Sequence, residues 1–458
     1  MSAAAARFAA AAYRGVVAAV DLLPAGWRYG YVTPVAARVL GGDQPAGFRP
    51  VTPAPAPATA TPASGPERPV PAPRLHVGLV TGRLDVGGVE AVVAMLTERL
   101  PHEAVRCTVV CTQLGRTAAT LRTSGAQVEV VTTAERAAAT FQAIGADVLQ
   151  LHNAPPFLVA AARRSGLPLV PVVHNTEVYN TGEDWRAAAE LLDHSPQAVA
   201  VSAAVRDYYR AHLPCETATA WSVVPNAAPV GSVRTSADRD QARELLGRFL
   251  GVELATETVL VCPARYDAQK NLPGTVAAFH SLAATPGRHR LRLVIAGEVT
   301  DWVEHRRADA VRRAGPMRDR VHLLGNSDTS MLLAAADGLL LDSFFEGWPV
   351  VGSEAVTVGL PLVIADVGGA VELVSAGHGV VVPNPAGPTA GLDPRVLARA
   401  RRATSQVNVP ALRAALLRVG PHDLDRRSPL RDEQVSAAVD AMARAHAAVL
   451  AAAAGSAL

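Results

Sequence analysis

The chain has 458 residues, of which 49% are hydrophobic, 18% are charged and 4% are aromatic. This apolar content is enough to build large cores, which excludes a wholly disordered or fibrous protein. The 43 basic and 41 acidic residues nearly cancel, leaving a formal net charge of +2. Such a balanced chain is not suited to coating nucleic acid, and we expect no nucleic-acid partner.

The first 49 residues are rich in alanine but do not predict a membrane-spanning helix. The most apolar run, Phe8 to Pro24, contains Arg14 and Asp21 and is shorter than the ~20 apolar residues that cross a bilayer. Its internal charge also argues against a signal peptide. We expect residues 1–49 to be a helical or disordered extension. A weak surface helix or disorder is the simplest interpretation, and a peripheral contact with the inner membrane face or with a partner is the alternative.

Residues 50–73 contain nine prolines in 24 positions, which favours extended polyproline geometry and predicts a linker. Short β-rich runs alternate with helical segments over residues 74–232, and this pattern restarts over residues 233–392. Residues 393–458 predict helices that pack back across the domains. The predicted strands are Leu75–Thr81, Cys107–Thr112, Val128–Val131, Val148–Leu151, Leu169–Val173 and Ala198–Val201, then Thr258–Pro263, Leu291–Ala296, Arg320–Leu324, Gly338–Asp342, Leu362–Ala365 and Gly379–Val382.

Strands that alternate with helices form parallel sheets joined by right-handed crossovers. The sequence therefore predicts an α/β protein with two Rossmann-like doubly wound domains that face a central cleft, followed by a helical C-terminal tail. The four cysteines are too few and too scattered for a disulfide scaffold or a zinc site. We expect reduced thiols, no metal and a cytoplasmic location.

The most informative motif is a pair of glutamates around a predicted helix start. Glu346 follows a predicted strand, Pro349 suits the first turn of a helix, and Glu354 lies about two turns into it. A helix start offers free backbone N–H groups and a positive dipole end to a phosphate. Carboxylates beside it are good acceptors for the hydroxyls of a sugar or a ribose. The segment thus predicts a phosphate- and sugar-binding loop.

Two cations follow the first strand of the second predicted domain. Arg265 presents a planar fork of donors and Lys270 a mobile point charge, so together they suit a diphosphate. In the first domain, Gly87 and Gly88 open a predicted helix. Gly82 and Gly87 have the spacing of a P-loop, but Gly88 and Val89 stand where lysine and serine or threonine are required, and no dinucleotide fingerprint occurs at this turn. These two glycines are interpreted as a turn that lets a ligand approach the backbone.

Arg265 and Lys270, together with Glu346-x₇-Glu354, resemble the retaining family-4 glycosyltransferases of the GT-B fold, also described as glycosyl transferases group 1. The resemblance covers roughly residues 74–385. Smaller landmarks of the family follow in order at Gly87-Gly88, His174, Ser202, Asn226, Gly297, Gly325, Asp337 and Gly368-Gly369. The sequence departs from the family at Asp342, where a proline often precedes the serine.

The resemblance implies roles for particular residues. The implied catalytic residues are His174, Arg265, Lys270 and Glu346, and the implied donor-binding residues are Gly87, Gly88, Gly297, Gly347, Trp348, Pro349, Val350 and Glu354. Arg265 and Lys270 would bind the donor diphosphate, Glu346 the transferred sugar and Glu354 the ribose. His174 is preferred over His152 as the histidine near the transferred sugar.

The function that the resemblance implies is a retaining, hexosyltransferase-type reaction without a metal or another cofactor. The donor would be a nucleotide-diphosphate sugar, and the acceptor a glycan, a lipid or a small molecule. Two alternatives stay open at this point. One is a non-catalytic protein that binds sugar nucleotides, because fold alone does not fix activity. The other is a glycoside hydrolase that uses Glu346 and Glu354 as its two carboxylates.

Overall fold

The computed structural model describes residues 3–23, 27–50, 71–85, 87–229, 236–283, 285, 290–419 and 424–455. Their contacts divide the chain into two compact units. Unit 1 comprises Met1–Val51, Ser232–Glu346 and Val351–Arg431, and unit 2 comprises Thr52–Gly231, Gly347–Val350 and Asp432–Leu458. The linker predicted at 50–73 lies outside the described residues over 51–70.

Unit 2 is built on a seven-stranded parallel sheet in the order β5-β3-β1-β6-β7-β8-β9. Its strands are β1 (Leu75–Thr81), β3 (Val105–Cys111), β5 (Gln127–Val130), β6 (Val148–His152), β7 (Leu169–Val173), β8 (Gln197–Ala200) and β9 (Ala220–Val223), beside a two-stranded ribbon of β2 (Arg83–Leu84) and β4 (Gln113–Leu114). Every residue of β1, β6 and β7 is buried, as expected for strands covered on both faces.

Unit 1 is built on a six-stranded parallel sheet in the order β12-β11-β10-β13-β14-β15. These strands are β10 (Thr258–Pro263), β11 (Leu291–Ala296), β12 (Val321–Leu324), β13 (Gly338–Leu341), β14 (Leu362–Ala365) and β15 (Gly379–Val382). Numbered along the chain, this is the order 3-2-1-4-5-6 of the doubly wound fold, which reverses direction between β10 and β13. The first six strands of unit 2 have the same order, with the reversal between β1 and β6.

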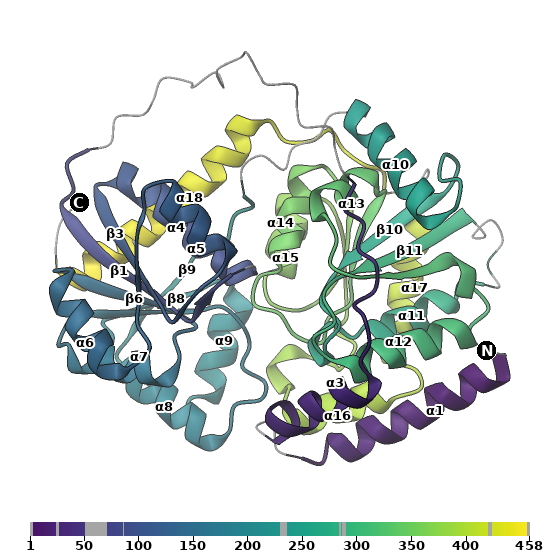
Figure 1. Cartoon of the computed structure of the whole chain (residues 1–458), viewed down its shortest axis with the longest axis horizontal. Helices are drawn as coiled ribbons and strands as arrows, with labels where there is room; N and C mark the ends of the chain where they lie inside the picture. The colour runs from purple at the N-terminus through teal and green to yellow at the C-terminus, as the bar shows by residue number, and fades with distance from the viewer. Residues whose placement is uncertain are drawn as a thin grey trace. The chain divides into compact units, whose positions relative to one another are not determined.

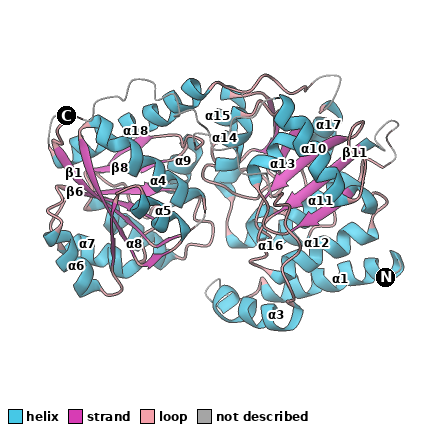
Figure 2. Cartoon of the chain, turned by 45° about the horizontal axis from the view of Figure 1, so that its top comes forward, coloured by secondary structure: helices cyan, strands magenta, loops and turns pink. Residues whose placement is uncertain are grey.

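Helices cover both faces of each sheet (Figure 1, Figure 2). In unit 2 they are α4 (Gly88–Arg99), η2 (Leu100–Glu103), α5 (Arg116–Thr123), α6 (Ala134–Ala143), α7 (Pro156–Arg164), α8 (Gly182–Asp193), α9 (Ala203–His212) and α18 (Asp432–Ala454). The core of this unit forms where apolar residues of α6 and α7, such as Phe141 and Leu158, pack on Leu149 of β6. The predicted pair of doubly wound parallel sheets with a helical C-terminal segment is confirmed.

The helices of unit 1 include the N-terminal ones. They are α1 (Ala3–Val20), η1 (Arg28–Val32), α3 (Thr33–Leu40), α10 (Ser236–Leu250), η3 (Ala268–Lys270), α11 (Leu272–His280), α12 (Trp302–Ala314), η5 (Arg318–Arg320), α13 (Thr329–Ala335), α14 (Val350–Thr357), α15 (Ala370–Ala376), η6 (Thr389–Gly391), α16 (Pro394–Arg402) and α17 (Val409–Arg418). The first residue of α14, Val350, groups with unit 2.

The C-terminal helix α18 belongs to unit 2 although it follows unit 1 in the chain. It packs against α4, β6 and β8, as Figure 1 shows for the yellow helix among the blue elements. Among the described residues it is the one helix long and apolar enough to cross a membrane, but half of its most apolar window is buried in the protein. Because this packing buries Met442, Ala443 and Leu450, α18 is a core helix of the unit.

The N-terminal extension, which the sequence left as helical or disordered, is helical and packed on unit 1. We call its described part, residues 3–23 and 27–50, the arm. Its helix α1 lies along α12 and touches α16. Past the helices, Gln44 exchanges two hydrogen bonds with the backbone of Val299, at 3.2 and 3.0 Å. Phe48 is buried against Phe249, with ring centroids 5.6 Å apart, so the arm is an integral part of the unit.

Candidate active site

Most of the charged side chains predicted for the site in unit 1 follow the carboxyl ends of β10 and β13. These two strands are neighbours, and the topology reverses between them, which is where doubly wound sheets form their ligand crevice. Arg265 and Lys270 follow β10, and Glu346 follows β13. The structure brings the last two together, because Nζ of Lys270 lies 2.5 Å from Oε1 of Glu346.

Lys270 lies in a capped turn that fixes where its side chain starts. Asp267 is mostly buried and accepts hydrogen bonds from the backbone N–H groups of Gln269 and Lys270, at 3.0 and 3.2 Å. Burial raises the pKa of Asp267, while Lys270 and Arg265 oppose this shift. The next residue, Asn271, has a φ of +53°, a left-handed conformation that asparagine tolerates better than most residues. The turn can therefore end and α11 begin without a glycine.

Glu346 is held by three side chains. Besides Lys270, Oγ of Ser343 donates to its Oε1 at 2.7 Å, and Nε2 of Gln269 donates to its Oε2 at 3.1 Å. Gln269 also donates to the backbone carbonyl of Phe345 at 2.9 Å. An ionised carboxylate has about four acceptor positions. Glu346 is thus fixed in orientation and still has capacity to accept a hydrogen bond from a ligand hydroxyl.

Asp342 explains one departure from the family pattern. Its buried carboxylate accepts from Nδ2 of Asn271 at 3.0 Å and from Nδ2 of Asn408 at 2.7 Å. Burial raises the pKa of Asp342 to about 7, against which these hydrogen bonds act. Asn271 comes directly after Lys270 and Asp342 four residues before Glu346. Asp342 therefore ties together the two loops that carry the ion pair, a link that a proline at this position lacks.

Arg265 and Gly297 lie at the same edge of the sheet. The Arg265 side chain is 57% exposed and pairs with Asp267 at 3.3 Å, so its guanidinium is accessible to an anion. Gly297 follows β11, and a Cβ atom there would lie 2.0 Å from the carbonyl oxygen of Ala264. Because that carbonyl belongs to the residue before Arg265, Gly297 provides the space in which the Arg265 segment sits.

Glu354 lies in α14, and burial shifts the pKa of its carboxyl group. Desolvation raises the pKa of Glu354 to about 7. Within the described part of the chain, no side chain or backbone N–H donates to its carboxylate. A mostly buried carboxyl without a protein partner is a candidate for binding a ligand hydroxyl.

In unit 2, the predicted glycine turn opens α4. Gly87 is the N-cap residue and Gly88 the first helical residue. The Glu90 carboxylate lies over this helix start, since a Cβ atom on Gly87 would be 2.3 Å from its Oε2. Gly347, Trp348, Pro349 and Val350 group with this unit. The contribution of these six residues to donor binding remains a prediction.

His174 is the end of a buried hydrogen-bonded chain within unit 2. It follows β7, and its Nε2 lies 2.9 Å from Nδ1 of His152 at the end of the neighbouring strand β6. Nε2 of His152 lies 3.1 Å from Oε1 of Gln150, and Nε2 of Gln150 lies 2.9 Å from Nδ1 of His446 on α18. The two candidate histidines of the sequence are therefore coupled, and a fourth residue comes from the C-terminal helix.

Burial keeps these three imidazoles neutral. It lowers the pKa of His174 to about 3 and that of His446 to about 4, and it moves the pKa of His152 well below its ordinary value. A neutral imidazole has one donor and one acceptor nitrogen. With the Gln150 amide donating to His446, His152 is protonated on Nε2 and accepts on Nδ1 from Nε2–H of His174. Nδ1 of His174 is then left as an acceptor.

Known proteins match both units. The family described as Glycosyltransferase Family 4 matches residues 86–230, and the family described as Glycosyl transferases group 1 matches residues 251–390. The chain belongs to glycosyltransferase family 4. An uncharacterized glycosyltransferase of Methanocaldococcus jannaschii is 31% identical over 132 residues, which span 28% of this chain and 32% of that relative. The matched region is thus about a third of the relative's length.

Solved structures share the fold of this family-4 chain. HepE of Anabaena in complex with UDP-glucose superposes with a TM-score of 0.57 at 18% identity, covering 82% of this chain and 95% of HepE. WaaG, a glycosyltransferase involved in lipopolysaccharide biosynthesis, superposes with a TM-score of 0.53 at 16% identity, covering 82% of this chain and 99% of WaaG. These likenesses support the GT-B arrangement of two parallel-sheet α/β units.

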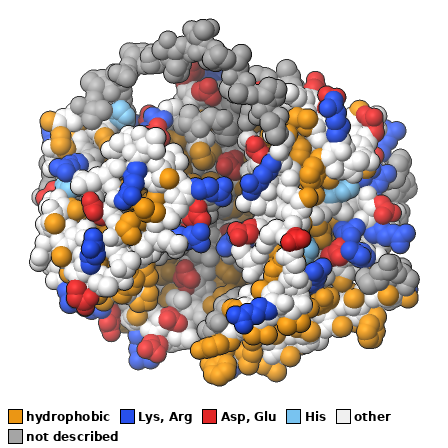
Figure 3. Space-filling model, in the orientation of Figure 1, with side chains coloured by type: hydrophobic (Ala, Val, Ile, Leu, Met, Phe, Trp, Pro, Cys, Tyr) orange, Lys and Arg blue, Asp and Glu red, His pale blue; other side chains and the backbone are white. Residues whose placement is uncertain are grey.

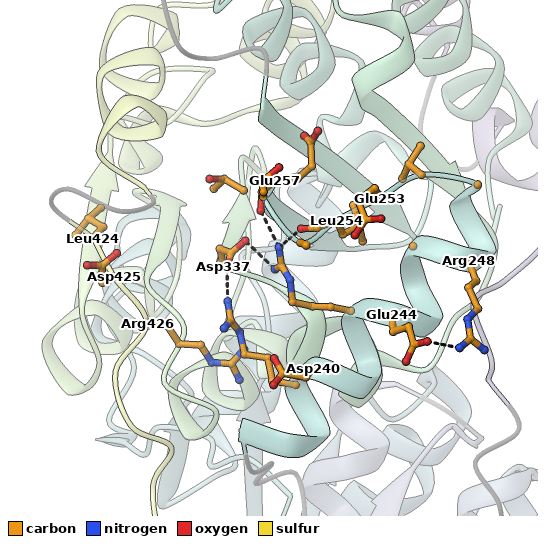
Figure 4. Close-up of a pocket in the computed structure, with 18 residues that line it drawn as sticks. Asp240, Glu244, Arg248, Glu253, Leu254, Glu257, Asp337, Leu424, Asp425 and Arg426 are labelled. Atoms are coloured by element: carbon orange, nitrogen blue, oxygen red, sulfur yellow. Dashed lines mark hydrogen bonds and ion pairs between the residues drawn. The ribbon is translucent and has the colours of Figure 1, made fainter.

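A separate cavity of about 1070 Å³ lies at the amino ends of the strands of the unit 1 sheet (Figure 4). It is lined by Glu257 and Thr258 at the start of β10 and by Asp337 just before β13. Arg239 and Arg243 pair with Asp337 at 2.7 and 3.0 Å. These arginines brace the amino ends of the strands, whereas the predicted donor-binding residues Arg265 and Lys270 follow the carboxyl end of β10.

Sequence reasoning missed several residues that position the predicted site residues. Gln269 and Ser343 hold Glu346 and lie within a few residues of predicted positions, so their polar side chains beside the motif were an available signal. Gln150 and His446 gave no such signal, because 296 residues separate them. Among the described residues, no group of three or more His, Cys, Asp or Glu is arranged to hold a metal ion.

Proposed function

We propose that the chain transfers a sugar, with retention of anomeric configuration, from a nucleotide-diphosphate sugar to an acceptor hydroxyl. The observation that carries this proposal is the Lys270–Glu346 pair at the topological switch point of the unit 1 sheet, with Arg265 beside it. A cation next to a sugar-binding carboxylate suits a substrate in which a sugar is joined to a phosphate.

Arg265 and Lys270 would neutralise the donor diphosphate. The Lys270 side chain is 17% exposed and that of Arg265 is 57% exposed, so one charge is fixed inside the site and the other closes on the ligand from its rim. Fixed charges in a poorly hydrated site act more strongly on developing negative charge than the same charges in water. Two such cations would supply the charge stabilisation that a metal gives elsewhere, and we propose that no metal is needed.

Glu346 and Glu354 would orient the two sugars of the donor. Glu346 has acceptor capacity beyond its three protein donors and would accept from hydroxyls of the transferred sugar. Glu354, which lacks a donor among the described residues, would accept from the ribose hydroxyls. Hydrolysis by these two carboxylates is less well supported, because the pairing of Glu346 with Lys270 opposes its use as a general acid.

In the proposed step, the bond from the anomeric carbon to the diphosphate oxygen breaks and the acceptor oxygen bonds to the same face of that carbon. The acceptor proton moves to the departing phosphate, so the products are the glycoside and the nucleoside diphosphate. His174, with Nδ1 as an acceptor, is proposed to contact a hydroxyl of the transferred sugar. The acceptor is proposed to be a glycan, a lipid or a small molecule, and the location cytoplasmic.

The test is a donor screen followed by a product assay. Melting temperatures are measured with UDP-, GDP- and ADP-sugars, because a ligand that binds the native state raises its stability. UDP-glucose comes first, since HepE was solved with it. The stabilising donor is then incubated with an acceptor panel in EDTA, and NMR reads the anomeric configuration of the product. Retained configuration supports the proposal. An inverted product, dependence on metal, free sugar alone, or tight binding without any turnover would contradict it.

A further inference from the structure

The exposed apolar side chains of the chain are concentrated in the arm. Among the described residues, eleven large hydrophobic side chains are exposed, and seven of them belong to the arm: Phe8, Val16, Leu22, Trp27, Tyr31, Val35 and Val39. Trp27 and Phe8 are 62% and 78% exposed. Figure 3 shows hydrophobic side chains, in orange, gathered on the part of the surface where Figure 1 places α1 and α3. Isolated exposed apolar residues are ordinary, whereas a gathered set marks a surface that contacts something apolar.

The helix α1 is apolar on both of its sides. Ala6, Ala10 and Val17 are buried, on the side that packs against unit 1. Phe8 and Val16 project from the opposite side, which carries alanines and glycine in place of the charged residues of an ordinary surface helix. A helix that is hydrophobic all round normally has apolar surroundings on every side. Among the described residues, none covers this outer side of α1, where Phe8 is 78% exposed.

The charges of the arm favour a lipid surface over a protein partner. The arm has five arginines and two aspartates, and Asp21 is buried in ion pairs with Arg28 and Arg401. Asp43 is therefore the exposed aspartate of the arm, and it is outnumbered by the exposed arginines Arg7 and Arg38. An apolar surface with arginines, a tryptophan and a tyrosine is the combination that seats in the headgroup region of an anionic bilayer.

The arm is held rigidly enough to present this surface. Arg401 of α16 pairs with Asp21 of the arm and, at 2.6 Å, with Glu304 of α12. These side chains are at most 3% exposed. A buried network of ion pairs is costly to break. The same surface on a second copy would bring arginines against arginines across a twofold axis, which disfavours self-association.

We infer that the outer surface of the arm, formed by the seven exposed residues named above, docks the protein peripherally on an anionic membrane. The apolar side chains enter the headgroup region, and the exposed Arg7 and Arg38 contact lipid phosphates. The inference does not depend on the proposed glycosyl transfer, because it concerns a surface on α1 and α3 and its test needs no substrate.

The test is co-sedimentation of the full chain with vesicles. Vesicles of phosphatidylcholine with about 30% phosphatidylglycerol, an anionic content at which basic segments bind, are compared with vesicles of pure phosphatidylcholine. The variant Phe8→Ser/Trp27→Ser is compared with the control Val371→Ser/Val407→Ser, whose residues are exposed elsewhere in unit 1. Circular dichroism and thermal unfolding confirm that both variants fold, as expected for changes at exposed positions.

We expect the wild type and the control to sediment with the anionic vesicles, and the arm variant to bind at least tenfold more weakly. Binding of the wild type should also weaken as salt is raised, because the arginine contacts are screened. Equal binding of the arm variant and wild type, or the absence of binding to anionic vesicles, overturns the inference. Concentration-dependent self-association that is lost in the arm variant also overturns it, since the surface would then be a protein interface.

Discussion

Arg265 and Lys270 have the same charge and the same proposed role, but they differ in burial, so their substitution separates stability from catalysis. The Lys270 side chain is 17% exposed and pairs with Glu346, which is 7% exposed. Lys270→Met leaves a buried carboxylate without its cation, which costs about 3–5 kcal/mol of unfolding free energy. Arg265 is 57% exposed and its pair with Asp267 is longer, at 3.3 Å, so Arg265→Met should cost only about 0–1 kcal/mol.

The double variant Lys270→Met/Glu346→Gln provides the matched control. It removes both charges of the pair, so most of the stability lost in Lys270→Met should return. Turnover behaves differently, because each cation is proposed to stabilise the same departing diphosphate. Each single variant, and the double variant, should therefore lose about 2.7–4 kcal/mol of transition-state stabilisation, which is roughly 10²–10³ in rate.

The measurements are urea unfolding of the full chain, monitored by tryptophan fluorescence, and the turnover rate with one sugar donor, for the wild type and the three variants. The reasoning is refuted if Arg265→Met and Lys270→Met lose the same stability, or if the double variant is no more stable than Lys270→Met. Near-normal turnover in both single variants would refute the assigned role in catalysis while leaving the stability argument intact.

Three further predictions concern titratable groups. Burial raises the pKa of Glu354 to about 7, so the donor affinity measured by calorimetry should fall by at most about tenfold per pH unit below pH 7. Glu354→Gln should abolish this pH dependence. The same pH dependence in the wild type and the variant would contradict the ribose role. Asp342 has a pKa of about 7 when folded and 3.8 as its ordinary value, so its proton stabilises the fold at low pH and this stability is lost as pH rises toward 7. Between pH 5 and 8, the unfolding free energy of Asp342→Asn should therefore fall less than that of the wild type, by up to about 1.4 kcal/mol per pH unit. An equal fall in both proteins would contradict the raised pKa of Asp342. Finally, ¹⁵N-histidine spectra should show His174 protonated on Nε2 in the wild type and a mixture of tautomers in His446→Leu, whereas identical spectra would argue against the hydrogen-bonded chain.

The strands were largely predictable because they are buried on both faces. Leu75–Thr81 and Leu169–Val173 were predicted at their observed limits, since a parallel strand covered by helices is a nearly continuous apolar run. The strand β9, Ala220–Val223, was missed because its residues are half-buried or exposed at the sheet edge. The helix α8 was also missed, although its capping box of Thr181 and Asp184 is a recognised start signal.

The site was predictable in its charged residues and not in the residues that hold them. Lys270 and Glu346 were singled out from their motifs, and the doubly wound order places the ends of the first and fourth strands, which they follow, next to each other. The links from Asp342 to Asn271 and Asn408 depend on packing between segments 66 and 71 residues apart. Likewise, the ion pair of Asp21 with Arg401 joins residues 380 apart, so no local pattern indicated that the N-terminal extension packs on unit 1.

The most direct test of the central claim is a crystal structure of the chain with the nucleotide sugar that stabilises it most. The account predicts that the diphosphate oxygens lie within hydrogen-bonding distance of Nζ of Lys270 and the guanidinium of Arg265, with the ribose hydroxyls on Glu354. A nucleotide sugar bound among Arg239, Arg243 and Arg426, at the amino ends of the unit 1 strands, would contradict the proposed donor site.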